Sequence, residues 1–186
     1  MNKRLTMLLV GLALPMAAPA AAPTLVIDPG GSSIQIDVES TLDSFVAQLH
    51  DFDAAISLGP GQGEVEAARF HFLFSHLKTG DADRDAAMYA WENVGAFPEG
   101  SFVLSAVQPG AGRHLVARGL LRFHGVEREV TLPFTVSIQG RTLAIDGETA
   151  LDTRDYGLPV FRKYIFLRVD PTVRVRFHLL GKLAGP

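Results

Sequence analysis

The chain has 186 residues, contains no cysteine and carries a formal net charge of −3. The lack of cysteine excludes a disulfide framework, a thiol nucleophile and a cysteine-linked lipid anchor. The mildly acidic balance argues against a nucleic-acid partner and against electrostatic docking on anionic lipid, because both need an excess of Lys and Arg.

The N-terminus has the layout of a secretory signal peptide. A basic start, Met1–Arg4, precedes an apolar run, Leu5–Leu14, and the small-residue cleavage pattern Ala18–Ala20. The run is too short to span a bilayer, and no later segment is apolar for long enough to do so. The sequence therefore predicts a signal peptide at residues 1–20 and an exported chain without an integral membrane segment. Residues 21–186 are numerous enough for a single domain with its own core.

Alternation of apolar and polar residues recurs along the exported part and is typical of half-buried strands. Eight stretches show this pattern, at residues 32–40, 52–58, 64–76, 101–107, 113–125, 127–138, 141–151 and 172–180. Short connections with Gly and Pro favour antiparallel neighbours in a sandwich or a barrel. Pro133 falls inside one stretch and needs an edge or a bulge there, because it lacks a backbone N–H.

The same alternation predicts which side chains share a face. Phe70, Phe72 and Phe74 lie on one face of their strand. In the stretch 127–138, one face of the predicted strand holds five apolar residues, Val130, Leu132, Phe134, Val136 and Ile138.

The segment from His76 to Gly95 interrupts this pattern. Asp81 or Asp83 can cap a helix, and the helix is predicted at about 84–93. Its apolar face is predicted to hold Ala87, Met88, Trp91 and Val94. So short a helix needs an apolar support, and the open end of a barrel is the expected place.

The stretch GLLRFHGVEREVTLPF, written around a His-Gly-Val turn, resembles a hairpin of the YceI-like proteins and is the most specific match. LVIDPGGSSIQIDV, FDAAISL, TGDADRDAAM, FPEGSFVL and DTRDYGLP are similar to other parts of the family pattern, although Thr153 stands where the family often has Arg.

The resemblance implies an all-β, eight-stranded antiparallel lipocalin-like barrel that encloses a polyisoprenoid or an isoprenoid quinone. It also implies a periplasmic binding protein rather than an enzyme. An extracellular location and a homodimer are compatible with it.

The abundance of Phe, twelve in all, provides an independent reason to expect an apolar binding site. An eight-stranded barrel is just wide enough to be filled by its own side chains or to hold one small ligand. The predicted cavity-lining residues are Phe70, Phe72, Phe74, Met88, Trp91, Phe102, Phe123, Phe134 and Phe177. A structural or partner-binding module with a filled barrel remains the alternative.

Polar residues add little to the prediction. Arg84 with Asp85 and Arg154 with Asp155 could meet a ligand headgroup, but paired or solvated loop charges are the favoured explanation. The six His show no ligand spacing, so neither a metal nor a cofactor is predicted. No catalytic constellation is present in the sequence, and the protein is predicted not to be an enzyme.

Overall fold

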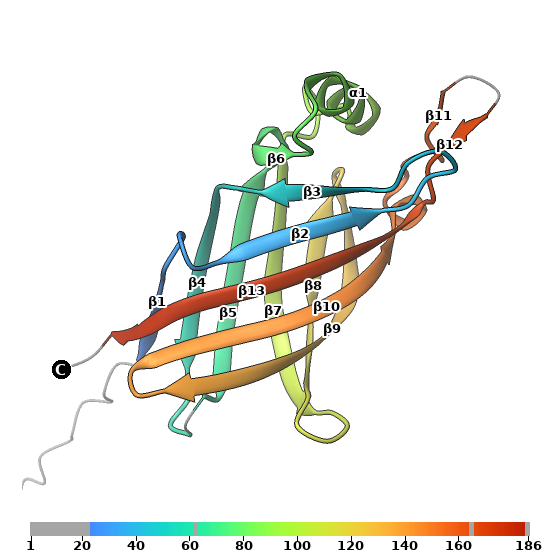
Figure 1. Cartoon of the computed structure of the whole chain (residues 1–186). Helices are drawn as coiled ribbons and strands as arrows, with labels where there is room; N and C mark the ends of the chain where they lie inside the picture. The colour runs from blue at the N-terminus through green and yellow to red at the C-terminus, as the bar shows by residue number, and fades with distance from the viewer. Residues whose placement is uncertain (1–22, 62, 164–165, 185–186) are drawn as a thin grey trace, which may run out of the picture.

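The computed structural model describes residues 23–61, 63–163 and 166–184, so the predicted signal peptide lies outside the described residues. A closed antiparallel barrel with one short helix at one end confirms the predicted fold (Figure 1). The strands are β1 Thr24–Ile27, β2 Ser33–Val38, β3 Phe45–Leu49, β4 Phe52–Leu58, β5 Val65–Leu73, β6 Leu77–Lys78, β7 Glu99–Pro109, β8 Leu115–Phe123, β9 Val126–Gln139, β10 Thr142–Asp152, β11 Arg162–Lys163, β12 Leu167–Arg168 and β13 Thr172–Ala184. The helices are η1 Phe74–His76, α1 Ala82–Glu92 and η2 Thr153–Tyr156.

The barrel closes through interrupted strands. β13 pairs with β10 on one side, and on its other side with β2 in its first half and β1 in its second. β1 and β2 therefore share one position in the barrel. β3 and β4 share the next position, and β5 and β6 the one after it. Together with β7, β8, β9, β10 and β13, they make the eight positions.

Pro133 lies in β9 where one ladder ends. β9 pairs with β10 only from Phe134 to Gln139, so Pro133 is the first residue beyond this ladder. Its missing N–H therefore leaves no gap in the pairing with β10.

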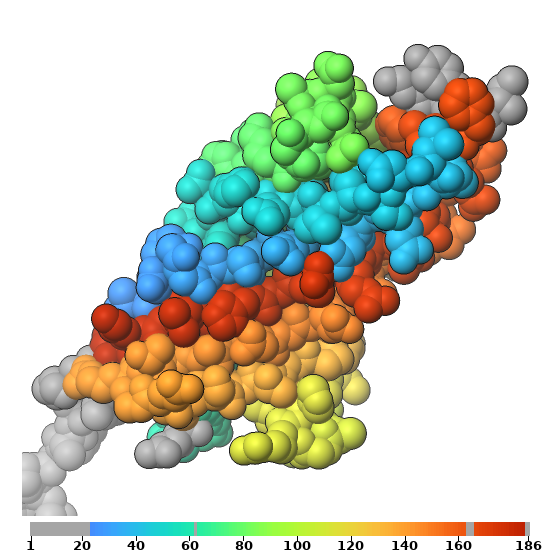
Figure 2. Space-filling model, viewed as in Figure 1, coloured from blue at the N-terminus to red at the C-terminus, as the bar shows by residue number. Residues whose placement is uncertain are grey.

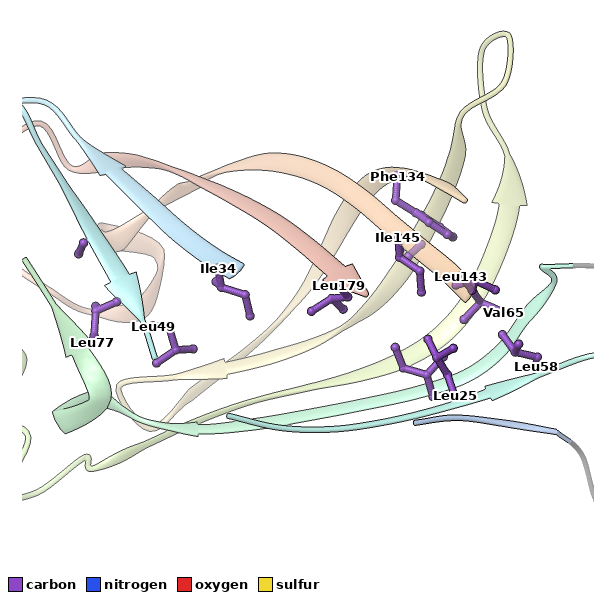
Figure 3. Packing of buried hydrophobic residues seen from close by; sticks show 13 residues of the cluster. Leu25, Ile34, Leu49, Leu58, Val65, Leu77, Phe134, Leu143, Ile145 and Leu179 are labelled. Atoms are coloured by element: carbon purple, nitrogen blue, oxygen red, sulfur yellow. The ribbon is translucent and has the colours of Figure 1, made fainter. Parts of the chain in front are cut away.

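The end of the barrel away from α1 is closed by aliphatic packing. Leu25, Leu58 and Leu143, which are 4, 3 and 0 % exposed, gather there from three strands (Figure 3). Val65 and Ile145 pack beside them and belong to the same core cluster. This packing leaves the opposite end, under α1, as the open part of the barrel.

Helix α1 begins two residues earlier than predicted. Asp81 is its N-cap and accepts hydrogen bonds from the backbone N–H groups of Asp83 and Arg84. The helix ends at Glu92, because Asn93 takes the left-handed conformation with φ of 56°. Val94 therefore lies beyond the helix, and its predicted place on the apolar face is wrong. Within the described residues, no helix is long and apolar enough to cross a membrane.

Candidate functional site

The barrel encloses a cavity of about 630 Å³ between the aliphatic end and α1. This volume lies within the roughly 300–1,000 Å³ that is usual for small-molecule sites. All eight barrel positions and α1 contribute side chains to the lining, and most of these side chains are apolar. The alternative of a barrel filled by its own side chains is therefore wrong.

The nine predicted site residues all lie on the lining of this one cavity. They are Phe70, Phe72, Phe74, Met88, Trp91, Phe102, Phe123, Phe134 and Phe177. For those of the nine residues that lie in strands, the period-two pattern therefore predicted the inward face correctly. Their contact with a ligand remains a prediction.

Several aromatic rings form a continuous row along the wall. The ring centroids of Phe70 and Phe72 are 6.0 Å apart, and those of Phe72 and Phe74 are 5.2 Å apart. The row continues to Phe123, whose ring centroid is 5.1 Å from that of Phe74. Tyr156, which is buried but is not part of the lining, lies 5.1 Å from Phe123. These separations are typical of favourable aromatic pairs.

Glycines on neighbouring strands hold some of these rings in place. Phe72 is paired across the ladder with Gly100, and a Cβ at Gly100 would overlap its ring. Phe177 lies in the same way against Gly147, where an added Cβ would be 2.5 Å from the ring. Without a side chain at these glycines, the rings can lie flat against the backbone of the next strand.

Sequence reasoning missed part of the lining. Phe45 and Phe161 face the cavity, although they lie outside the predicted strands. On the apolar face of β9, Val130 and Leu132 line the cavity, whereas Ile138 does not and is 36 % exposed. Strand β9 extends beyond the inner end of the cavity, so Val136 and Ile138 near its end do not line the cavity.

Helix α1 covers the mouth and is held by contacts near both of its ends. The Trp91 indole N–H donates to the Pro159 carbonyl at 2.8 Å. Towards the other end, the Arg84 guanidinium lies 3.4 Å from the Asp43 carboxylate and 4.5 Å from the centroid of the Phe45 ring. Figure 2 shows α1, in green, beside the cyan segment that carries Asp43, so the two cover the upper end of the barrel together.

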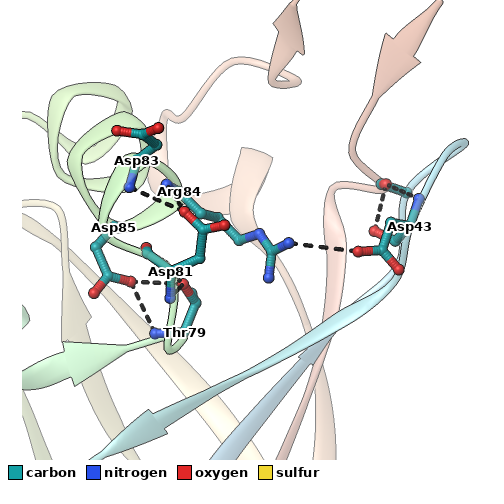
Figure 4. A network of polar contacts seen from close by, with 7 residues as sticks. Asp43, Thr79, Asp81, Asp83, Arg84 and Asp85 are labelled. Atoms are coloured by element: carbon teal, nitrogen blue, oxygen red, sulfur yellow. Dashed lines mark hydrogen bonds and ion pairs between the residues drawn. The ribbon is translucent and has the colours of Figure 1, made fainter.

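Two acidic groups at the start of α1, Asp81 and Asp85, accept structural hydrogen bonds (Figure 4). The Asp85 carboxylate accepts from the backbone N–H of Thr79 at 2.8 Å and from its hydroxyl at 2.7 Å. The hydrogen bond from the Arg84 N–H lowers the pKa of Asp81. Both groups therefore stabilise the helix start.

Glu92, the last residue of α1, differs from these acids. It lines the cavity, is 2 % exposed, and neither carboxyl oxygen has a hydrogen-bond partner among the described residues. Burial raises the pKa of Glu92 to about 8, so the carboxyl is mostly protonated at neutral pH. Sequence reasoning gave no role to this residue.

The second predicted charge pair does not reach the cavity. Arg154 pairs with Asp152, and neither Arg154 nor Asp155 lines the cavity. Thr153, at the position where the family often has Arg, is buried and donates its hydroxyl to the Pro171 carbonyl at 3.0 Å. No group of three or more metal-ligating side chains occurs in the part of the chain that the structure describes.

Comparison with known proteins agrees with this architecture. UPF0312 proteins of Pseudomonas syringae pv. tomato and Pseudomonas savastanoi pv. phaseolicola are 27 % identical over 169 residues, covering 85 % of this chain and 88 % of theirs. BcnA of Burkholderia cenocepacia has the same fold, with a TM-score of 0.75 at 21 % identity over 84 % of this chain and 99 % of BcnA.

A polyisoprenoid binding domain from Saccharophagus degradans also shares the fold. Its TM-score is 0.63 at 12 % identity, and the match covers 88 % of this chain and 99 % of that domain. The family model of the YceI-like domain matches residues 25–180, nearly the whole barrel. The chain therefore belongs to the YceI-like family.

Proposed function

We propose that this chain is an exported protein that binds a long amphiphilic lipid, a polyisoprenoid or an isoprenoid quinone, inside its barrel. The observation that carries the proposal is the apolar cavity of about 630 Å³, lined by a row of aromatic rings and covered by α1. The similarity to a polyisoprenoid binding domain supports this class of ligand.

Apolar burial supplies enough free energy for such binding. Ten to fifteen buried carbons contribute roughly 8–12 kcal/mol, at about 0.8 kcal/mol for each CH₂. The entropic costs of association remove several kcal/mol. The remainder corresponds to about micromolar affinity or tighter. The chain of the lipid would therefore dominate the affinity, and the headgroup would set its orientation.

Export to the periplasm is the location we propose, on the pattern of residues 1–20. A periplasmic lipid-binding protein keeps a long apolar chain out of water between membranes. The role is binding rather than catalysis, because the cavity wall consists mainly of side chains without acid–base or nucleophilic chemistry.

A pair of variants on β5 tests the proposal. Ala68 lines the cavity, whereas the adjacent Ala67 is exposed and is not part of the lining. Ala68→Trp places an indole in the cavity and should abolish binding of an added polyprenol. Ala67→Trp adds the same group outside and should leave binding unchanged, as measured by native mass spectrometry. Equal binding by both variants would contradict the proposed site.

A further inference from the structure

Glu92 is the one buried polar residue of the described chain whose side chain lacks a partner. Three polar or charged residues are buried: Asp85, Glu92 and Thr153. Asp85 accepts two hydrogen bonds from Thr79, and Thr153 donates one to Pro171. A buried polar group without a hydrogen-bond partner costs on the order of 1–3 kcal/mol. We therefore expect such a group on a cavity wall to form a hydrogen bond with the bound ligand.

We propose that Glu92 recognises the polar head of the bound amphiphile, and that this head is an uncharged oxygen group, a hydroxyl or a carbonyl, rather than a phosphate. The inference rests on the proposed function and adds to it a headgroup class and an orientation. The head would lie under α1, and the chain would run towards Leu25 and Leu143 at the closed end.

The chemistry of a neutral carboxyl fits such a head. The protonated group offers one O–H donor and one carbonyl acceptor. A ligand hydroxyl can use both, and a quinone carbonyl can accept from the O–H. The position of Glu92 in the last turn of α1 also disfavours a negative charge, because the carboxyl end of a helix is itself negative.

The other charged groups of the cavity lining disfavour an anionic head. They are Asp43, Asp81, Asp83 and Asp170 against Arg69 and Arg84. Arg84 is already paired with Asp43, 3.4 Å away. A phosphate would therefore enter a lining with more acidic than basic groups, whereas an alcohol or a quinone would bring no charge.

The test compares four ligands of equal chain length: a polyprenol, an isoprenoid quinone, a polyprenyl phosphate and the prenyl hydrocarbon. The only Trp, Trp91, lines the cavity and reports binding through its fluorescence. The wild type should bind the polyprenol or the quinone about tenfold more tightly than the hydrocarbon, the effect of one good hydrogen bond. The phosphate should bind more weakly than the polyprenol.

Variants at position 92 then assign this preference to the carboxyl. Glu92→Leu should bind polyprenol and hydrocarbon equally, while Glu66→Leu, which changes an exposed glutamate, should keep the wild-type preference. Glu92→Gln keeps a donor and an acceptor but cannot ionise. It should retain its affinity for the isoprenoid quinone from pH 7 to 9, whereas the wild type should lose affinity over that range, because an ionised carboxyl has no donor for the quinone carbonyl.

The outcomes separate the two proposals. A wild type that binds none of the four ligands refutes the proposed function itself. A wild type that binds neither polyprenol nor quinone more tightly than the hydrocarbon, or a Glu92→Leu variant that keeps the preference, overturns only the role of Glu92. If Glu92→Leu does not fold, a Glu92→Gln variant with the same loss of affinity at pH 9 as the wild type overturns that role as well.

Discussion

At the scale of single residues, the barrel depends on side chains whose surroundings are unusual for their type. Glu92 is a carboxyl in an apolar wall, with its pKa raised to about 8 by burial. Gly100 is a strand glycine whose missing side chain makes room for the ring of Phe72. Substitution of Glu92 should change how stability depends on pH, and substitution of Gly100 should lower stability.

The first prediction concerns Glu92 and pH. In the unfolded chain Glu92 has the ordinary glutamate pKa of 4.5, whereas burial raises its pKa to about 8 in the folded protein. Between these values the folded state holds more protons, so the free energy of unfolding should fall as pH rises, by about 1.4 kcal/mol per unit. Urea unfolding at pH 5, 6.5 and 8 measures this fall.

Glu92→Gln should remove this contribution to the pH dependence, because glutamine does not titrate. Glu66→Gln, a change at an exposed glutamate, should leave the wild-type slope in place. Identical slopes for the wild type and Glu92→Gln would show that Glu92 is not held in its neutral form.

The second prediction concerns Gly100. Gly100→Ala should destabilise the fold by about 1–3 kcal/mol, because the new Cβ overlaps the ring of Phe72 and the ring must move into the cavity. Gly95→Ala is the matched control, since a Cβ there would meet nothing within 4 Å. Thermal unfolding compares the two, and an equal melting temperature would argue against the close packing of Phe72.

At the scale of elements, α1 is the helix that covers one end of the cavity. Its own hydrogen bonds cannot sustain a helix of 11 residues in water. It depends on the Asp81 cap, on the Arg84–Asp43 contact and on the hydrogen bond from Trp91 to Pro159. Since Asp43 is largely exposed, the ion pair is the weaker of the two attachments to other elements.

The third prediction follows from the Trp91 attachment. Trp91→Phe keeps an aromatic ring in the cavity wall but removes the N–H donor to Pro159. Release of bound polyprenol should become about threefold to tenfold faster, the effect of losing one hydrogen bond that holds the cover. Stopped-flow transfer of a fluorescent prenyl probe to vesicles measures the rate. Unchanged release would show that α1 does not limit exit.

The period-two pattern predicted eight of the barrel strands and missed β1 and β3, where the exposed Val26 and Val46 break the alternation. Where the alternation is clear, it indicates which face of a strand points inward. The aromatic residues Phe70, Phe72 and Phe74 illustrate this, since all three line the cavity. The sequence does not determine where α1 starts, because Asp81 and Asp83 are equally good caps in isolation. In the folded protein Asp81 is the N-cap.

Glu92 could not be predicted from the sequence. Glu92 follows Met88 by four residues and so lies on the same side of the helix, but an acidic side chain at the edge of an apolar face is ordinarily solvated. Its burial depends on how α1 is rotated over the barrel, and that rotation is fixed by contacts with Pro159 and Asp43, which are distant in the chain. Local patterns carry no information about such contacts.

At the scale of the whole molecule, the barrel combines one closed end with one covered end. Aliphatic side chains around Leu25 and Leu143 fill the first, and α1 lies over the second (Figures 1 and 3). The cavity lies between them, and single strands contribute successive inward residues to its lining, such as Val130, Leu132 and Phe134 of β9. This arrangement favours a lipid that enters and leaves beside α1.

The central measurement is mass spectrometry of the protein purified from its native host, first intact under gentle conditions and then after solvent extraction. We predict a stoichiometric adduct in the intact spectrum and, in the extract, an isoprenoid alcohol or quinone of the corresponding mass. A protein that has no adduct, and that acquires none after incubation with polyprenol and isoprenoid quinone, would contradict lipid binding in the barrel.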